Sequence, residues 1–116
     1  MPKRHTPGDI LLAGLVFTSQ AGTKRRPVIV IRDGGDDDLL VAPVTGQAAR
    51  VAYDVSLRDW PQAGLRIPSV VRLEKLATIE KATVLRSLGR PSAGDWARVR
   101  ERLAQLWQEI LRDWSR

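Results

Sequence analysis

Lys24-Arg25-Arg26-Pro27-Val28-Ile29-Val30-Ile31 is the stretch from which the fold of this chain is best predicted, because three cations lead directly into four β-branched residues. A continuous Val/Ile run is typical of a strand that is buried on at least one face. Pro27 has a fixed φ and no N–H, which suits the first residue of a strand. We therefore expect Arg26 at a junction of loop and strand, where its guanidinium can meet phosphate or carboxylate oxygens. Taken alone, the stretch favours the simpler interpretation of a solvated loop edge before a core strand.

Length and composition indicate one small domain without disulfides or bound metal. The chain has 116 residues, which suits a single modest core. We expect one domain over 1–116, with a flexible tail at 1–7, a barrel at 8–90 and an amphipathic helix at 92–114. There is no cysteine and one histidine, His5, and the run Asp36–Asp38 lacks the spacing of a calcium loop. The sequence therefore predicts no metal and no cofactor.

The charge pattern favours a polyanionic partner. The net charge is +6, and residues 1–32 carry six Lys or Arg against one Asp. Residues 33–59 carry two cations and six anions, whereas residues 60–91 again carry six and two. Such a surplus attracts nucleic acid without distinguishing RNA from DNA. No apolar run is long enough to cross a membrane and no signal-peptide pattern is present, so we expect a cytoplasmic protein.

Short apolar runs separated by Gly and Pro predict several short strands. The expected strands are 10–17, 26–32, 38–44, 51–57, 69–73 and 84–88. The composition of 33–37 predicts a turn that joins the second and third strands in a hairpin. Gly14 suggests a bulge, and Pro43 suggests an edge or bulge position.

The C-terminal segment predicts one amphipathic helix, over about 93–113. Ser92, with Asp95 three residues later, resembles a helix N-cap. Apolar residues then recur at steps of three and four: Trp96, Val99, Leu103, Leu106, Trp107, Ile110 and Trp114. We expect this stripe to pack against the strands or a second subunit, with its tryptophans in the core or interface. The fold class is therefore mainly β with a C-terminal helix, as a small antiparallel barrel or strongly bent sheet.

Polar side chains occur at three places where a predicted strand meets a loop. These are Arg26, Thr45 and the pair Arg72 and Glu74. Side chains two apart in a strand share a face, so Val70, Arg72 and Glu74 are expected to point the same way. Taken alone, Arg72 and Glu74 are better explained as a surface ion pair that contributes about 0 to 1 kcal/mol. Sequence spacing does not show whether the fold brings Arg26 and Thr45 together.

The order of motifs over residues 8–112 resembles the MazF/PemK family of toxin–antitoxin ribonucleases. The similar segments are Gly8-Asp9-Ile10, residues 24–30, Ala42-Pro43-Val44-Thr45, Ala63-Gly64-Leu65, residues 69–74, Ala77-Thr78-Ile79 and Leu88-Gly89-Arg90. Each segment is weak alone, and the ordered set is specific. The resemblance implies an SH3-like barrel, a homodimer, a cognate antitoxin, and metal-independent cleavage of single-stranded RNA.

The resemblance also implies roles for particular residues. Arg26 and Thr45 match the family's active-site Arg and Thr, and Arg72 with Glu74 matches an Arg-x-acid pair that is catalytic in some members. The family often carries Glu-Gln, sometimes after a His, in the loop before its Arg-Pro, whereas residues 18–23 contain no acid and no histidine. Contacts with RNA are expected from Gln20, Thr23, Lys24, Arg25 and Gln47.

The chemistry implied by the resemblance asks little of the protein. RNA supplies its own nucleophile, the 2′-OH, so the enzyme needs a base, a cation for the pentacoordinate phosphorane, and help for the leaving 5′-oxygen. On this hypothesis Arg26 stabilises the phosphorane and Thr45 Oγ hydrogen-bonds a phosphoryl oxygen. Glu74 is the candidate base, although a neighbouring Arg72 would lower its pKa.

Two other functions stay open at this point. A CcdB-like barrel would act as a toxin by binding DNA gyrase, with no nuclease step. A small barrel of this kind could also bind nucleic acid without cutting it. Incubation with single-stranded RNA in EDTA separates the three. The nuclease predicts cutting, the CcdB-like toxin predicts neither cutting nor binding, and the nucleic-acid binder predicts binding alone.

Overall fold

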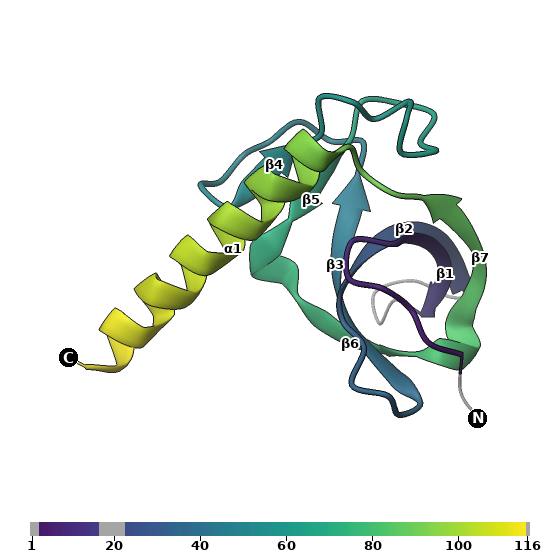
Figure 1. The fold of residues 1–116 in the computed structure, drawn as a ribbon, viewed down its shortest axis with the longest axis horizontal. Coiled ribbons are helices and arrows are strands. Elements are labelled where there is room, and N and C mark those ends of the chain that lie inside the picture. Colours follow the sequence, from purple (N-terminus) through teal and green to yellow (C-terminus); the bar gives the residue numbers. More distant parts are fainter. Residues whose placement is uncertain (1–2, 17–22, 116) are drawn as a thin grey trace.

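The computed structural model describes residues 3–16 and 23–115, which form an antiparallel sheet and one long helix (Figure 1). The strands are β1 (Ile10–Val16), β2 (Thr23–Arg32), β3 (Asp38–Thr45), β4 (Asp54–Ser56), β5 (Val70–Arg72), β6 (Ala77–Glu80) and β7 (Val84–Gly89). Two 3₁₀ turns, Leu73–Lys75 and Lys81–Thr83, flank β6, and α1 covers Ala93–Trp114.

The sheet curls strongly but does not close. Its strand order is β4-β5-β3-β2-β1-β7, and β6 pairs with the first half of β3, from Asp38 to Val41. β6 continues into β7 through the turn Lys81–Thr83, and β7 pairs with β1, so the strands wrap around a common interior (Figure 1). Within the described residues β6 and β7 do not pair with each other. The predicted class, mainly β with a C-terminal helix, is confirmed in the form of a strongly bent sheet.

The run Val28–Ile31 is continuously apolar because β2 separates two cores. Val28 and Val30 pack inside the curled sheet with Val41 of β3. Ile29 points to the other face and packs in the cluster beneath α1 that includes Val99. Alternate side chains of one strand therefore enter different cores, and each must be apolar.

The predicted hairpin of β2 and β3 is confirmed, with Ile29 opposite Ala42. β2 begins at Thr23, three residues earlier than predicted, because its first half pairs with β1 alone. Pro27 therefore lies inside β2, directly before the first residue paired with β3, where a missing N–H is tolerated. Pro43 lies in the gap between the parts of β3 that pair with β6 and with β5.

Three strand predictions are wrong in detail. β6 is not among the expected strands: it buries only one apolar side chain, Ile79, and it is a strand because β3 pairs with it. β4 covers three residues rather than 51–57, because Val51 is exposed in the turn before it. The irregularities in β1 lie opposite β7, between Ile10 and Leu11 and between Leu12 and Ala13, and not at Gly14.

The N-terminus of α1 is capped as the sequence predicts. Ser92 Oγ accepts a hydrogen bond from the amide of Asp95 at 3.1 Å. The buried carboxylate of Asp95 in turn accepts hydrogen bonds from the amides of Arg58 and Asp59, at 3.0 and 2.8 Å. Burial raises the pKa of Asp95, but these amides and the Arg98 guanidinium outweigh it and lower the pKa. The cap therefore also fixes the loop that leads from β4 to β5.

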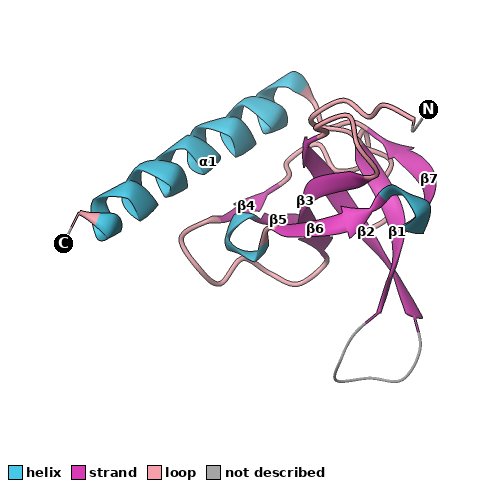
Figure 2. Ribbon diagram, turned by 90° about the horizontal axis from the view of Figure 1, so that it is seen from below, coloured by secondary structure: helices cyan, strands magenta, loops and turns pink. Residues whose placement is uncertain are grey.

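The apolar stripe of α1 is buried in its first half and exposed near its end. Val99 and Leu106 are buried in the core beneath the helix. Trp107 and Trp114 are 53% and 71% exposed and contact each other edge to face. The last turns of α1 extend beyond the sheet, on the side away from the outer ends of β1 and β2 (Figure 2). None of the helices described is both long and apolar enough to span a bilayer.

The N-terminal segment is attached to the sheet from residue 5 onward, inside the stretch predicted to be a tail. The His5 amide donates a hydrogen bond to Asp33 at 2.8 Å, and Asp33 also accepts from the Gly35 amide and pairs with Lys81 at 3.0 Å. The side chain of Asp33 is 1% exposed. The hydrogen bonds from the His5 and Gly35 amides, followed by Lys81, hold its pKa far below the ordinary value of 3.8.

We expect this carboxylate to make the fold sensitive to acid. Because the folded pKa of Asp33 lies below its unfolded value, its stabilisation is fully present above the unfolded value and is lost as the pH falls toward the folded one. The free energy of unfolding, measured with urea between pH 7 and pH 3, should fall less steeply in Asp33→Asn than in the unmodified protein. Asp37→Asn, at an exposed position of the same turn, should keep the original slope. Equal slopes for the two variants would contradict this.

Candidate functional site

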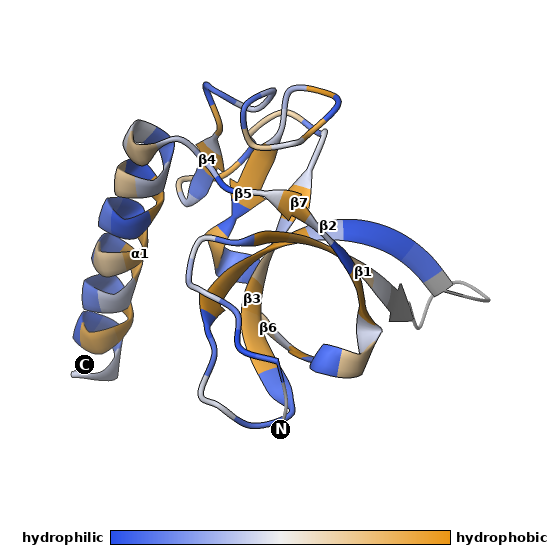
Figure 3. Ribbon diagram, turned by 45° about the vertical axis from the view of Figure 1, so that its right-hand side comes forward, coloured by the Kyte–Doolittle hydropathy of each residue, from blue (hydrophilic) through white to orange (hydrophobic). Residues whose placement is uncertain are grey.

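One cavity in the structure, of about 600 Å³, is lined by four arginines. We call it the arginine pocket; the lining polar groups used below are Arg25, Arg26, Arg66, Arg86 and Thr45. It lies where the outer half of β2, β7 and the loop between β4 and β5 come together. No Asp or Glu belongs to its lining in the part of the chain that the structure describes. The hydrophilic outer half of β2 contrasts with its apolar inner half in Figure 3.

Arg26 and Thr45 are brought together by the register of the β2–β3 hairpin. The β2–β3 pairing ends with Val28 opposite Pro43, and Arg26 and Thr45 each lie two residues beyond that pair on the two adjacent strands. Both residues line the arginine pocket. The two residues expected at separate strand ends therefore occupy neighbouring positions at one edge of the sheet.

A tight backbone contact brings the loop between β4 and β5 against the end of β7. Gly64 has a φ of +83°, and a Cβ built there would lie 2.0 Å from the carbonyl oxygen of Leu88. Gly89 faces the same contact from the other strand, since its Cβ would lie 2.6 Å from the carbonyl oxygen of Ala63. This contact explains why both segments carry a glycine, and it places Arg66 over the pocket.

Gly64→Ala is expected to displace this loop. The new methyl group would meet backbone atoms that cannot rotate away, at a φ that alanine adopts only with strain of about 1 to 3 kcal/mol. We expect the free energy of unfolding to fall by at least that amount in urea titrations. Gly94→Ala is the matched control, because a Cβ at Gly94 meets nothing within 4 Å. If both variants are as stable as the original chain, the contact is not a constraint.

Thr45 is held in place by hydrogen bonds that leave its proton available. The backbone amide of Gln47 donates a hydrogen bond to Thr45 Oγ1 at 3.2 Å. Arg72 Nη2 donates to the side-chain oxygen of Gln47, Oε1, at 3.0 Å. A hydroxyl has one proton to donate and two lone pairs. With one lone pair occupied, the Thr45 hydroxyl can still donate to an oxygen in the pocket.

Arg72 and Glu74 do not reach the arginine pocket. They line a separate cavity of about 370 Å³, together with Arg50 and Asp54. β5 ends at Arg72 and Glu74 lies in a 3₁₀ turn, so the expected alternation of Val70, Arg72 and Glu74 along one strand face is wrong. The ion pairs among the described residues do not include one between Arg72 and Glu74, so the surface-pair interpretation is not supported either. Arg72 instead supports Thr45 through Gln47.

The residues expected to contact RNA are distributed unevenly. Arg25 lines the arginine pocket, whereas Gln47 lines an adjoining cavity of about 340 Å³ that shares Gly46 with it. Lys24 is exposed in β2, beside the pocket residues. Thr23 is the first residue of β2, and Gln20 lies outside the described residues.

Arg66 and Arg86 are the two arginines of the pocket that the sequence did not single out. Arg86 belongs to β7, where it lies opposite Leu12 of β1, and Leu12 lies opposite Pro27 of β2. The signal for both was the basic surplus of residues 60–91, which contains six cations. Only the fold shows which of the six meet at this cavity.

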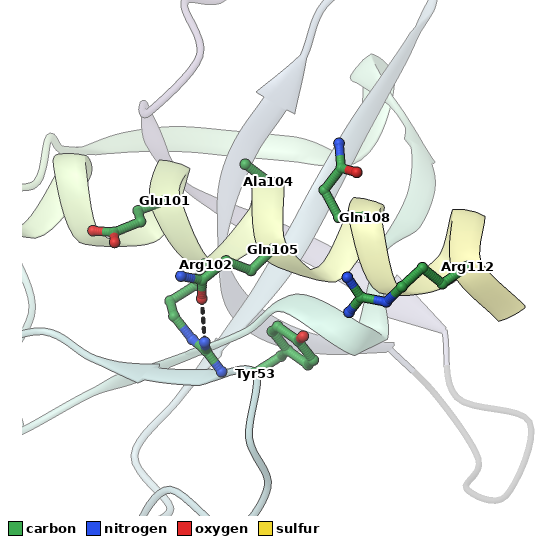
Figure 4. Close-up of a pocket in the computed structure, with 7 residues that line it drawn as sticks. All are labelled: Tyr53, Glu101, Arg102, Ala104, Gln105, Gln108 and Arg112. Atoms are coloured by element: carbon green, nitrogen blue, oxygen red, sulfur yellow. Dashed lines mark hydrogen bonds between the residues drawn. The ribbon is translucent and has the colours of Figure 1, made fainter.

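A second large cavity, beside α1, is built differently (Figure 4). It is lined by Tyr53 and by helix residues of both charges and neutral amides. The Tyr53 hydroxyl donates to Glu109, which raises the pKa of Tyr53, and the Arg102 guanidinium lies 4.4 Å above the Tyr53 ring. Figure 4 shows Arg102 hydrogen-bonded to Gln105. These side chains satisfy one another and fasten α1 to the turn before β4. No group of three or more His, Cys, Asp or Glu in the described residues is placed to hold a metal ion.

Comparison with known proteins gives one family and several similar structures. The model of the family described as PemK-like, MazF-like toxin of type II toxin–antitoxin system matches residues 6–107. A Mycobacterium tuberculosis toxin, MazF-mt6, is 24% identical with a TM-score of 0.70, over 86% of this chain and 96% of that one. A MazE-MazF structure from Deinococcus radiodurans is 25% identical with a TM-score of 0.69, over 88% and 94%.

A third solved structure, an endoribonuclease in complex with its cognate antitoxin from a mycobacterial species, is 14% identical with a TM-score of 0.70, over 88% of this chain and 93% of that one. Comparison with curated proteins gives no significant match. The solved structures have the same fold as this chain along nearly all of their length.

Proposed function

This chain belongs to the PemK-like, MazF-like toxins of type II toxin–antitoxin systems, and from that premise we propose that it is an endoribonuclease that cuts single-stranded RNA. The 2′-OH of one nucleotide loses its proton as its oxygen bonds to the adjacent phosphorus, the bond to the 5′-oxygen of the next nucleotide breaks, and that oxygen takes up a proton, so the proton count is unchanged and no water is consumed. The products are a 2′,3′-cyclic phosphate and a 5′-hydroxyl end. The nucleophile comes from the RNA itself, which distinguishes this reaction from hydrolysis by an activated water.

The observation that carries the proposal is the arginine pocket. Four arginines and Thr45 line one cavity of about 600 Å³ that no Asp or Glu of the described residues lines. Guanidiniums stay charged at every physiological pH and match the oxygens of a phosphate. The same pocket would repel a cationic ligand, so a phosphodiester chain is the class of ligand that fits it best.

Arg26 and Thr45 divide the work on the scissile phosphate. The phosphorane carries more negative charge on its non-bridging oxygens than the ground state, and a fixed cation that meets this charge lowers the barrier. Arg26 supplies that cation. Thr45, whose oxygen already accepts from the Gln47 amide, donates its proton to a non-bridging oxygen. Arg72 acts as a positioning residue because it holds Gln47.

The test is incubation of the pure protein with single-stranded RNA in EDTA, followed by analysis of the RNA ends. We expect cutting, with cyclic phosphate on the 3′ ends of the upstream fragments. Binding without cutting would support a non-catalytic nucleic-acid binder instead. If the RNA is neither bound nor cut, the proposal is overturned and a toxin that acts by binding a protein is favoured.

Glu74→Gln should retain most of the activity, within about threefold of the original rate. Glu74 lines a different cavity from Arg26 and Thr45, so it is not placed to take a proton in the arginine pocket. Loss of a general base ordinarily costs about 10²- to 10⁴-fold. Single-turnover cleavage of a short RNA measures the difference, and a loss in that larger range would show that Glu74 reaches the reacting 2′-OH.

We also propose that a cognate antitoxin neutralises this protein by covering the arginine pocket with an acidic segment. A disordered acidic chain is suited to a basic cavity, because charge complementarity guides its association and the cavity orders it. The antitoxin and RNA should then compete. An antitoxin peptide that binds tightly while RNA cleavage continues at the same rate would contradict this.

A further inference from the structure

Arg66 and Arg86 exceed what a single phosphate at Arg26 and Thr45 requires. Arg66 belongs to the loop between β4 and β5, and Arg86 belongs to β7, so they approach the pocket from segments other than β2. Neither takes part in an ion pair with the residues described. Like charges gathered in this way repel one another, and a bound polyanion removes that repulsion.

The Gly64–Leu88 contact joins the two segments that carry these arginines, and both arginines line the arginine pocket. Each lies two residues from the contact, Arg66 after Gly64 and Arg86 before Leu88. Because the two backbones touch there, the segments that carry Arg66 and Arg86 cannot move apart independently. The pair is thus a fixed feature of the pocket.

The pair is also separated from the Arg26 end of the pocket. Arg86 lies opposite Leu12, which lies opposite Pro27, so two strand spacings separate Arg86 from β2. Two spacings amount to roughly 10 Å, which is more than one phosphate group spans. Arg86 and Arg26 therefore extend from backbone positions far enough apart to meet neighbouring phosphates of a bound chain.

We infer that Arg66 and Arg86 form a second phosphate subsite, which binds the phosphodiester next to the scissile one in single-stranded nucleic acid. The inference rests on the proposed function, which puts the scissile phosphate at Arg26 and Thr45. The second subsite fixes the direction and register of the strand across the pocket. It acts on binding, while Arg26 acts on the reaction.

The salt dependence of binding tests this subsite without any cleavage. A single-stranded DNA oligonucleotide serves as the probe, because it has the phosphates and lacks the 2′-OH that the reaction consumes. For single strands, the slope of log K against log salt concentration is about −0.7 for each phosphate neutralised. Because the two arginines share one phosphate, the double variant Arg66→Gln/Arg86→Gln should make the slope shallower by about 0.7, and each single variant by no more than that.

Arg100→Gln is the matched control. It removes the same charge from an exposed position of α1 that does not line the arginine pocket, so its slope should equal that of the original chain. A slope for the double variant that equals that of the control would overturn the subsite. Melting temperatures of the variants check that they are folded, and we expect them to be unchanged because Arg66 and Arg86 are both exposed.

Failure of the subsite and failure of the proposed function give different results. If the slopes change but RNA is never cut, the nuclease proposal fails and the subsite stands as a binding feature. If RNA is cut and the slopes do not change, the subsite fails alone. Cleavage provides a further readout, since the double variant should raise KM for an RNA of several nucleotides and leave cleavage of a dinucleotide with one phosphodiester unchanged.

Discussion

Arg26→Ala should lower the rate of RNA cleavage by roughly a hundredfold or more, the magnitude typical of one lost transition-state donor. Arg26 lies near the end of the β2–β3 pairing and lines the same cavity as Thr45, so on the proposed mechanism it meets the charge that develops on the phosphate. Because that charge is greatest in the transition state, we expect most of the loss in kcat and less in KM. Single-turnover cleavage of a short RNA at saturating enzyme separates the two.

Two comparisons make the Arg26 result specific. Arg100→Ala removes the same charge from the exposed side of α1 and should cleave at the original rate, which excludes a general electrostatic effect. Arg26→Lys retains a charge and loses the forked donors, so it should recover part of the rate at most. Cleavage by Arg26→Ala at the original rate would show that the phosphorane is stabilised elsewhere.

Local sequence signals predict the hairpin that carries Arg26 and Thr45. The apolar run after Arg26, the turn at 33–37 and the apolar run before Thr45 define one hairpin. The register still depends on an irregularity between Val30 and Arg32, which shifts the pairing. Sequence alone therefore predicts the hairpin but not that Arg26 and Thr45 line the same pocket.

Glu74 shows how a correct local pattern can give a wrong neighbourhood. Alternation beyond Arg72 assumed a continuing strand, but β5 ends there because Leu73 turns into a 3₁₀ helix with its side chain fully buried. β6 was missed for the opposite reason, since its pairing with β3 and not its own composition makes it a strand. Both outcomes depend on contacts between segments distant in the chain.

The pocket's other half was not accessible to sequence reasoning for a related cause. The sequence shows six cations in residues 60–91, and nothing in their spacing selects Arg66 and Arg86. The selection is made by Gly64, whose missing Cβ allows the loop to touch the backbone of Leu88. Gly64 and Gly89 are far apart in the sequence, and only the fold brings their two segments into contact.

A single 2′-deoxy substitution in the RNA, at the nucleotide before the cut, should abolish cleavage at that position. The arginine pocket provides cations and a hydroxyl donor for the phosphoryl oxygens, and the proposed reaction takes its nucleophile from the RNA. The attacking oxygen in the proposed reaction is therefore the 2′-OH, and a substrate without it has no nucleophile in reach of the phosphorus. An oligonucleotide with one cleavable position, compared as all-RNA and as the deoxy-substituted form, measures this directly.

The deoxy-substituted RNA should nevertheless bind about as tightly as the unmodified one, because its phosphates are the same and electrostatic contacts dominate affinity. Retained binding with lost cleavage would place the effect in the reaction and make this oligonucleotide a competitive inhibitor with Ki near the Kd of the RNA. Cleavage of the substituted strand, with a 3′- or 5′-phosphate in place of the cyclic product, would mean that water is the nucleophile. That result would remove the reason for assigning Arg26 and Thr45 to a phosphorane formed by 2′-OH attack, even if both variants were inactive.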